Sequence, residues 1–447
     1  MEITKSQTQS KAVARKKRIP IEKRERRAWY LYDFGNSAYA AVVLLAVYSA
    51  YFKGTVVGGA EGSRLWGLSV GIAMLIVGLT SPILGALADS SQTKKRILLI
   101  FTVMASFFTA MLFFVGPGDV AKGMIFFILA EIGYRNGQVF YNALLPDIAE
   151  PEEMSRVSGN GWAIGSAGGI VCLLIVLGLI MGIGGQTVIR VAFLITAVFY
   201  AASTAPLFFL VKERTEPKPL PRGENYFSIS IKRLWETFKA ARKYQSFARF
   251  LGAFLVFNNG IMITLDFAAI IGATLFGLNQ TQLIAFMIIV QVTSVIGAFV
   301  FGRAAGRWGS KAILVVALLL MTITVSLLYF THSLTMFNIV GALAGFALTG
   351  VQSVSRTAVG QIAPEEKAAE FYGLFSLASQ LSNFIGPTLF GLLIVWFTNF
   401  YAGKGMEALP AEQSGLMLAL VSILVFLVVG MALLFTVRVW HRVDEEA

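Results

Sequence analysis

Residues 85–96 read GALADSSQTKKR, and residues 302–313 repeat the pattern as GRAAGRWGSKAI. The two stretches align without a gap and keep glycine, alanine and lysine at matching positions. A second pair, IAEPEE at 148–153 and IAPEE at 362–366, follows the fourth apolar segment of each half of the chain. Two echoes in the same order and in equivalent loops indicate a duplicated unit of six apolar segments.

Long apolar segments recur along the whole chain. Of its 447 residues, 56% are hydrophobic and only 14% are charged, whereas soluble domains carry nearer ~25% charged residues. Each segment has the ~18–25 residues needed to cross a hydrocarbon core of ~30 Å. We therefore predict an all-α membrane protein with about 12 transmembrane helices in two pseudo-symmetric six-helix bundles. The expected spans are 29–52, 66–88, 97–116, 123–145, 160–184, 188–211, 248–272, 282–303, 312–331, 335–355, 371–399 and 414–437.

Connections rich in basic residues alternate along the chain with connections that hold few of them. Most of the 37 Lys and Arg residues lie in the N-terminal segment and in every second connection. The other connections hold only Lys53, Arg64, Lys122, Arg190 and Lys404. The positive-inside rule then predicts that both termini are cytoplasmic. The basic N-terminal segment fits contact with an anionic membrane leaflet, so the net charge of +12 does not indicate nucleic-acid binding.

The longest polar connection separates six spans from six spans. It opens with three prolines and continues as a basic amphipathic helix over 228–247, which we expect to lie on the inner membrane surface. The predicted organisation is a cytoplasmic basic tail (1–27), an N-terminal bundle (28–211), a cytoplasmic linker (212–247), a C-terminal bundle (248–438) and a cytoplasmic tail (439–447).

The repeated loop resembles the inner-loop motif of the major facilitator superfamily. In that superfamily the aspartate and the basic residues of the motif tie neighbouring helix ends together and take part in rocking between states. The resemblance, together with the helix ends, makes the following residues inner-gate candidates: Asp89, Lys94, Lys95, Arg96, Arg307, Lys311 and Arg356. Snorkelling to the interface is the alternative for Arg356.

Three longer stretches are more specific. They are WYLYDFGNSAYAAVV from Trp29, VFYNALLPDIAEPEEMSRVSGNGWAIG from Val139, and GVQSVSRTAVGQIAPEEKAAEFYGLF from Gly350, with FIGPTLFG following from Phe384. Together they resemble the vacuolar-effluxer-like family, whose fungal members are associated with amino-acid efflux from the vacuole. The family often has Asn-Asp-Gly where Asn258-Asn259-Gly260 stands, and Gly-Lys where Ser379-Gln380 stands. Both departures remove a charge, so a mechanism based on those charges is in doubt for this chain.

Charged residues within the spans are the candidates for function, because a charge at the centre of a bilayer costs at least ~2.5–3.5 kcal/mol. Glu131 and Arg135 lie near the middle of the fourth span at i, i+4 spacing, on one helix face. Arg135 could hold a carboxylate, and Glu131 could bind an amine or carry a proton. The alternative is a structural pair in which the two charges only neutralise each other.

Other polar residues extend the set of candidates. Asp33 and Asp266 join Glu131 as candidates for proton coupling, with an inner-gate contact between helices as the alternative for Asp33 and an outer-gate contact for Asp266. The remaining cavity candidates are Asn36, Asn142, Asn258, Asn259 and Gln352. For Asn258 and Asn259 the alternative is a hydrogen bond that joins two helices.

The sequence offers no pattern typical of an enzyme, a metal site or a cofactor site. Cys172 is the single cysteine, and the histidines His332 and His441 are isolated at opposite helix ends. A zinc or haem site therefore has no set of ligands, and no phosphate-binding loop occurs.

We expect a secondary transporter that moves a small polar or zwitterionic solute such as an amino acid by alternating access, in the direction of efflux. Protons are the coupling ion we consider, the lipid bilayer is the surrounding partner, and a monomer is the expected state. A bacterial-type plasma membrane is a better expectation than a vacuole. Two alternatives stay open: a transporter of a lipid or drug-like amphiphile, because 36 Phe and 14 Met could line its cavity, and a membrane receptor or scaffold that transports nothing.

Overall fold

The computed structural model describes residues 22–90, 93–150, 153–214, 244–331, 333–363 and 368–437, together with Lys232, Trp235 and Lys239. The six spans of the first half are formed by α2 (Lys23–Tyr39) with η1 (Ala40–Ala46), α3 (Tyr48–Tyr51) and η2 (Phe52–Val57), then α4 (Gly59–Ser90), α5 (Lys94–Met111) with η3 (Leu112–Phe114), α6 (Val120–Ala143), α8 (Met154–Ile183) and α9 (Gln186–Leu210). The short α7 (Leu145–Ile148) follows α6.

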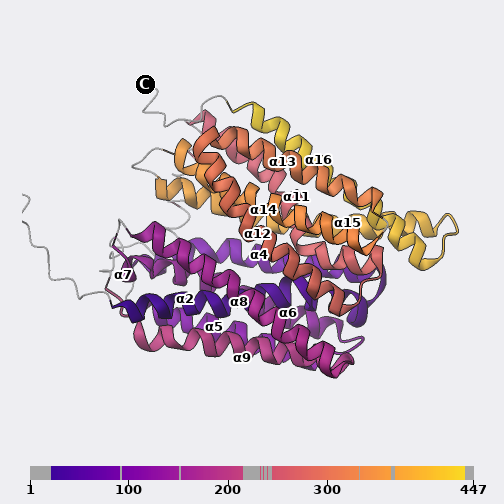
Figure 1. Cartoon of the computed structure of the whole chain (residues 1–447), viewed down its shortest axis with the longest axis horizontal. Helices are drawn as coiled ribbons and strands as arrows, with labels where there is room; N and C mark the ends of the chain where they lie inside the picture. Colours follow the sequence, from indigo (N-terminus) through magenta and orange to yellow (C-terminus); the bar gives the residue numbers. More distant parts are fainter. Residues whose placement is uncertain are drawn as a thin grey trace, which may run out of the picture.

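The second half repeats this order. Its spans are α11 (Gln245–Phe276), α12 (Gln280–Trp308), α13 (Ser310–Leu327) with η4 (Leu328–Phe330), α14 (Leu334–Ile362), α15 (Ala368–Ala402) and α16 (Ala408–Phe435). In Figure 1 the two halves form two layers, indigo to magenta and orange to yellow. Of the predicted linker helix over 228–247, only the first residues of α11 and three isolated helical positions (Lys232, Trp235 and Lys239) lie within the described residues.

The prediction of an all-α membrane protein with about 12 crossing helices is confirmed. Eleven helices of the described residues are long and apolar enough to span a membrane. The remaining crossing helix is α6, whose mean hydropathy is lowered by Glu131, Arg135 and several side-chain amides. The helix that looks least like a membrane span is therefore the one that carries the charged pair.

The packing inside the two halves is the same. In the first half α2 packs on α8 and α9, and α6 packs on α4 and α5; in the second half α11 packs on α15 and α16, and α14 packs on α12 and α13. The contacts between the halves repeat as well, since α4 packs on α15 and α12 packs on α8. This equivalence is the pseudo-symmetry that the repeated loops indicate.

The first helix begins at Lys23, before the predicted start of the first bundle at residue 28. The Glu25 side chain accepts a hydrogen bond from the backbone N–H of Glu22 at 2.9 Å, in a capping box that satisfies the start of the helix. Hydropathy alone misses this turn because it is rich in Arg and Lys.

Helix α4 approaches α15 through glycines. A Cβ at Gly67 would lie 2.2 Å from the backbone oxygen of Pro387, and a Cβ at Gly71 would lie 2.1 Å from Oγ1 of Thr388. Gly391 of α15 is in turn close to the backbone of Ser63. Small residues let membrane helices come this close, and dispersion between the backbones then stabilises the contact.

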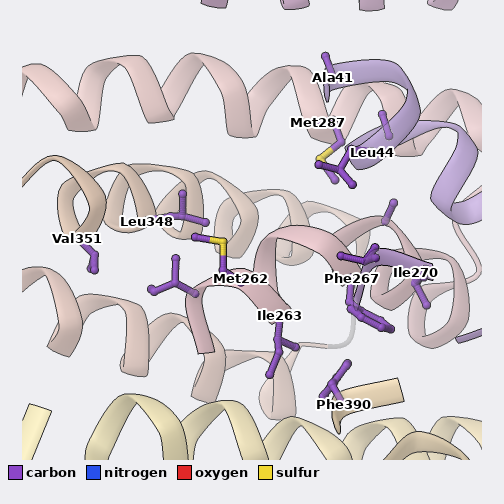
Figure 2. Packing of buried hydrophobic residues seen from close by; sticks show 14 of the residues in the cluster. Ala41, Leu44, Met262, Ile263, Phe267, Ile270, Met287, Leu348, Val351 and Phe390 are labelled. Atoms are coloured by element: carbon purple, nitrogen blue, oxygen red, sulfur yellow. The ribbon is translucent and has the colours of Figure 1, made fainter. Parts of the chain in front are cut away.

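We call the end of the bundle at which α2 begins and α16 ends the terminal end, and the opposite end the far end. The α4–α15 contact lies toward the far end. The glycines of α4 that make it are in the first half of that helix, which begins at the far end, and their partners are in the second half of α15, which ends there. Buried apolar side chains continue the contact between the halves. Figure 2 shows Ala41 and Leu44 of η1 beside Met287 where η1 meets α12, with Phe267 and Phe390 further along the same cluster.

A side chain added at Gly67 should weaken the contact between the two halves. We expect Gly67→Ala to lower the thermal unfolding temperature of the purified protein, because overpacking against backbone typically costs ~1–3 kcal/mol. Gly78→Ala is the matched control on the same helix, since its Cβ would lie an ordinary 3.8 Å from Gln380. Equal unfolding temperatures for the two variants would contradict the close α4–α15 contact.

Candidate functional site

The charged pair of α6 is the centre of the candidate site. The Arg135 Nε donates a hydrogen bond to Oε1 of Glu131 at 2.8 Å, one helical turn away. The side chain of Glu131 is fully buried, whereas that of Arg135 is 29% exposed. Within the described residues no hydrogen bond is recorded for the two terminal nitrogens of Arg135. They form a planar fork of the kind that binds a carboxylate with two parallel bonds.

Aromatic rings fix the arginine. The guanidinium carbon of Arg135 lies 5.2 Å from the ring centre of Tyr134, within the range of a cation–π contact. Tyr134 in turn packs on Tyr39 of α2, with 4.8 Å between the ring centres. Tyr39 was not a candidate from the sequence, because one tyrosine among many apolar residues of a span carries no signal of its own.

A residue of the second half completes the site. Asp266 of α11 is buried and interacts electrostatically with both Arg135 and Glu131. Its backbone oxygen accepts a hydrogen bond of 3.0 Å from Nε1 of Trp66, which holds this part of α11 against α4. The structure therefore brings together three of the predicted residues, one cation and two carboxyl groups, from both halves of the chain.

The candidates of the first span lie elsewhere. Asn36 is buried inside the first half, where its Oδ1 accepts a hydrogen bond from the Tyr200 hydroxyl at 2.9 Å. Asp33 lies against α8, since a Cβ at Gly165 would be 2.6 Å from its Oδ2. Both side chains lie between helices of the first half, and their roles in a cavity, a gate or proton coupling stay predictions.

The amide candidates are also dispersed. Asn258 and Asn259 are buried in α11, and Asn259 donates to the backbone oxygen of Leu255 at 2.6 Å. Asn142 is exposed near the end of α6, and Gln352 is partly buried in α14. Their role in a cavity stays a prediction.

The basic residues of the inner-loop motif hold the terminal end of the first half together. Lys94 forms a buried ion pair with Asp147 at 3.2 Å and donates to the backbone oxygen of Ala143. Lys95 donates to the last carbonyls of α9, at Phe208 and Val211, where a cation also meets the negative end of the helix dipole.

The remaining motif residues lie near the surface, apart from Asp89, whose side chain the structure does not describe. Arg96, Arg307 and Arg356 are exposed, and Lys311 donates to the backbone oxygen of Val437 at 2.5 Å. For Asp89 the structure describes the helix but not the side chain.

Two acidic residues that the motif does not contain join the beginning of the linker to the bundle. Asp147 accepts a hydrogen bond of 2.6 Å from the backbone N–H of Arg214, and the Arg214 guanidinium pairs with Glu25 at 2.7 Å. Nearby, Arg26 bonds to Glu153, and this hydrogen bond holds the pKa of the Glu153 carboxyl below its ordinary value. Asp147 and Glu153 lie in the stretch from Val139 that resembles the effluxer family, but their spacing in the sequence does not predict their partners.

A mostly apolar cavity lies in the second half, among α11, α12, α13 and α14. It encloses about 740 Å³ of empty space, part of it open to the outside. Three of its polar side chains, Thr264, Ser294 and Thr324, donate to backbone carbonyls, so the wall is apolar apart from Gln291. Within the described residues no group of three or more His, Cys, Asp and Glu side chains could hold a metal ion.

The far end is closed by bonds that cross between the halves. Lys53 of η2 and Glu412 of α16 form an ion pair at 2.6 Å, with side chains only 10% and 8% exposed. Close by, Gln280 of α12 donates to the backbone oxygen of Ala46 in η1 at 3.0 Å. The ion pairs described at the terminal end, in contrast, join residues of the first half and of the segments directly before and after it.

Comparisons with known proteins agree with this architecture. A family model described as "Vacuole effluxer Atg22 like" matches residues 66–401. An uncharacterised MFS-type transporter, YxiO of Bacillus subtilis, is 27% identical over 377 residues, covering 82% of this chain and 87% of that protein. Autophagy-related protein 22 of Yarrowia lipolytica is 23% identical over 416 residues, covering 74% of this chain and 70% of that protein.

Solved structures show the same fold. An inward-facing, occupied bacterial homologue of the human lysosomal transporter Spinster superposes with a TM-score of 0.69 at 18% identity, covering 92% of this chain and 95% of its own. The nucleoside transporter NupG superposes with a TM-score of 0.63 at 13% identity, covering 92% of this chain and 98% of its own.

The ion pair between the halves should contribute to stability. We expect Lys53→Glu to lower the thermal unfolding temperature strongly, because an unpaired buried charge costs ~3–5 kcal/mol. The exchanged pair, Lys53→Glu with Glu412→Lys, should recover most of that loss. The same reversal at Lys122 and Asp119, whose side chains are 44% and 36% exposed, should change little. Failure of the exchanged pair to recover stability would show that the two charges do not act together.

Proposed function

This chain belongs to the vacuole effluxer Atg22-like family, and we propose from that premise that it carries an amino acid or a similar zwitterion out across the membrane. The relatives and the fold of the chain make it a membrane transporter of the major facilitator type. The observation that carries the proposal is the cluster of Arg135, Glu131 and Asp266.

The cluster matches the charges of a zwitterion. The terminal nitrogens of Arg135 suit the carboxylate of the cargo, and the carboxyl groups of Glu131 and Asp266 suit its ammonium group. Because Asp266 belongs to the second half and Arg135 to the first, a cargo bound to both would connect the halves. A ligand that prefers one arrangement of the halves shifts the equilibrium toward it, which is what alternating access requires.

We also propose a direction of transport, a membrane, a coupling ion and an oligomeric state. The basic connections support cytoplasmic termini, in a bacterial-type plasma membrane, so the terminal end faces the cytoplasm. The closed far end then corresponds to an arrangement that opens inward, where cargo for efflux is taken up. Protons are the proposed coupling ion, through Glu131 or Asp266, and the transporter acts as a monomer.

A second candidate cargo is an amphiphile. The mostly apolar wall of the cavity among α11, α12, α13 and α14 supports it, since apolar side chains with few polar groups suit apolar ligands. The charged cluster favours the zwitterion, because an uncharged amphiphile would leave Arg135 unused.

Flux into proteoliposomes tests the proposal. Wild-type protein should transport at least one labelled amino acid, and a pH gradient should change the rate if protons are coupled. We expect Arg135→Lys to lower flux ~10-fold or more, because a lysine cannot form the two parallel bonds of a guanidinium. Arg156→Gln is the control, since the Arg156 side chain is 69% exposed and lies near the terminal end.

Two outcomes would contradict the proposal. Absence of flux for every amino acid would remove the zwitterion as cargo. If Glu131→Gln lowered the unfolding temperature and left flux intact, the pair of α6 would be structural.

A further inference from the structure

Two neighbouring polar atoms of the site are buried and make no bond of hydrogen-bonding geometry with the described residues. One is Oε2 of Glu131, and the other is the hydroxyl oxygen of Tyr39. The Tyr39 hydroxyl lies beside the Glu131 carboxyl group and interacts with it electrostatically and through a side-chain contact that falls short of hydrogen-bond geometry. Natural proteins satisfy the large majority of their buried polar atoms, so two adjacent exceptions need a physical reason.

The two atoms complement each other chemically. An ionised carboxylate only accepts hydrogen bonds, and a tyrosine hydroxyl can donate one. Glu131 now gives its other oxygen, Oε1, to Arg135. Release of Oε1 from Arg135 would leave the carboxylate free to accept a bond from the hydroxyl beside it.

The position of Tyr39 is fixed in advance. Its ring is fully buried and packs on Tyr134, whose ring also contacts Arg135. Tyr39 is the last residue of α2, directly before the π-helical η1. A donor held in this way loses little conformational freedom when it forms a bond.

We propose that Tyr39 is a positioning residue that receives the Glu131 carboxylate when a carboxylate of the cargo displaces it from Arg135. The proposal deepens the function proposed above and rests on it for the identity of the displacing group. The cargo occupies Arg135 from its exposed side, and Glu131 exchanges an ion pair for a charge-assisted hydrogen bond. Without the Tyr39 hydroxyl, the released carboxylate would stay buried without a hydrogen-bond donor in its place.

A test without cargo uses the variant Arg135→Gln, which releases Glu131 permanently. Tyr39→Phe should change the unfolding temperature little in wild-type protein, where the hydroxyl makes only a poorly aligned contact with Glu131. In the Arg135→Gln background, where the released carboxylate can turn toward the hydroxyl, it should lower that temperature by ~3 °C or more.

Tyr48→Phe is the matched control. Tyr48 is equally buried, but its hydroxyl donates to the backbone oxygen of Gly123 at 2.8 Å. Tyr48→Phe should therefore cost the same in both backgrounds. Equal costs of Tyr39→Phe in the two backgrounds would overturn the proposal, whether or not any amino acid is transported.

A binding measurement provides the second arm and decides the matter if Arg135→Gln does not assemble. The probe is a mixture of tritiated amino acids bound to the purified full-length protein. Tyr39→Phe should weaken binding ~10-fold in wild-type protein. The effect should vanish when Glu131→Gln is also present. An equal loss with and without Glu131→Gln would assign Tyr39 a packing role and overturn the proposal, whereas a wild-type protein that binds no amino acid would refute the proposed cargo and leave the first arm to decide on Tyr39.

Discussion

An ionised side chain inside hydrocarbon needs an opposite charge or water beside it. In this molecule the two ends of the bundle differ in whether the described ion pairs cross between the halves. At the terminal end Lys94 pairs with Asp147 and Arg214 pairs with Glu25, within the first half and the segments directly before and after it. At the far end Lys53 pairs with Glu412 across the halves. The halves can therefore separate at the terminal end without breaking these charge pairs, whereas separation at the far end breaks a buried one. The electrostatic cost of opening is unequal at the two ends.

Close packing reinforces the same difference. The glycines of α4 bring its backbone against α15. Where two helices meet through glycines there are few long side chains to interlock, so α4 and α15 can rock on each other as rigid bodies. Duplication explains why α12 meets α8 in the equivalent place: each contact is made of the second helix of one half and the fifth helix of the other.

The sequence predicts the elements of this fold far better than their contacts. Hydropathy places eleven of the crossings clearly and α6 only weakly, and helical spacing alone places Glu131 and Arg135 on one face. It does not predict Tyr39, because nothing local distinguishes this tyrosine from those that only pack. It also leaves the environment of Asn36 open, since spacing gives a helix face but not the neighbour on that face, which is Tyr200. Asp147 and Arg214 are 67 residues apart in the sequence, so their pairing cannot be read from local pattern.

The first span connects the candidate site with the far end through one irregular stretch of helix. Tyr39 precedes η1, and Lys53 lies in η2. Between them, the backbone N–H of Val47 bonds to the oxygen of Val42, five residues back, and the oxygen of Ala46 accepts its bond from Gln280 of the other half. π-helical turns of this kind are rare and occur frequently at functional sites. Because the second half supplies a bond at this irregular stretch, separation of the halves at the far end would remove that bond. The tyrosine beside Glu131 and the lysine of the far-end ion pair therefore stand on the same irregular span, on either side of a bond between the halves.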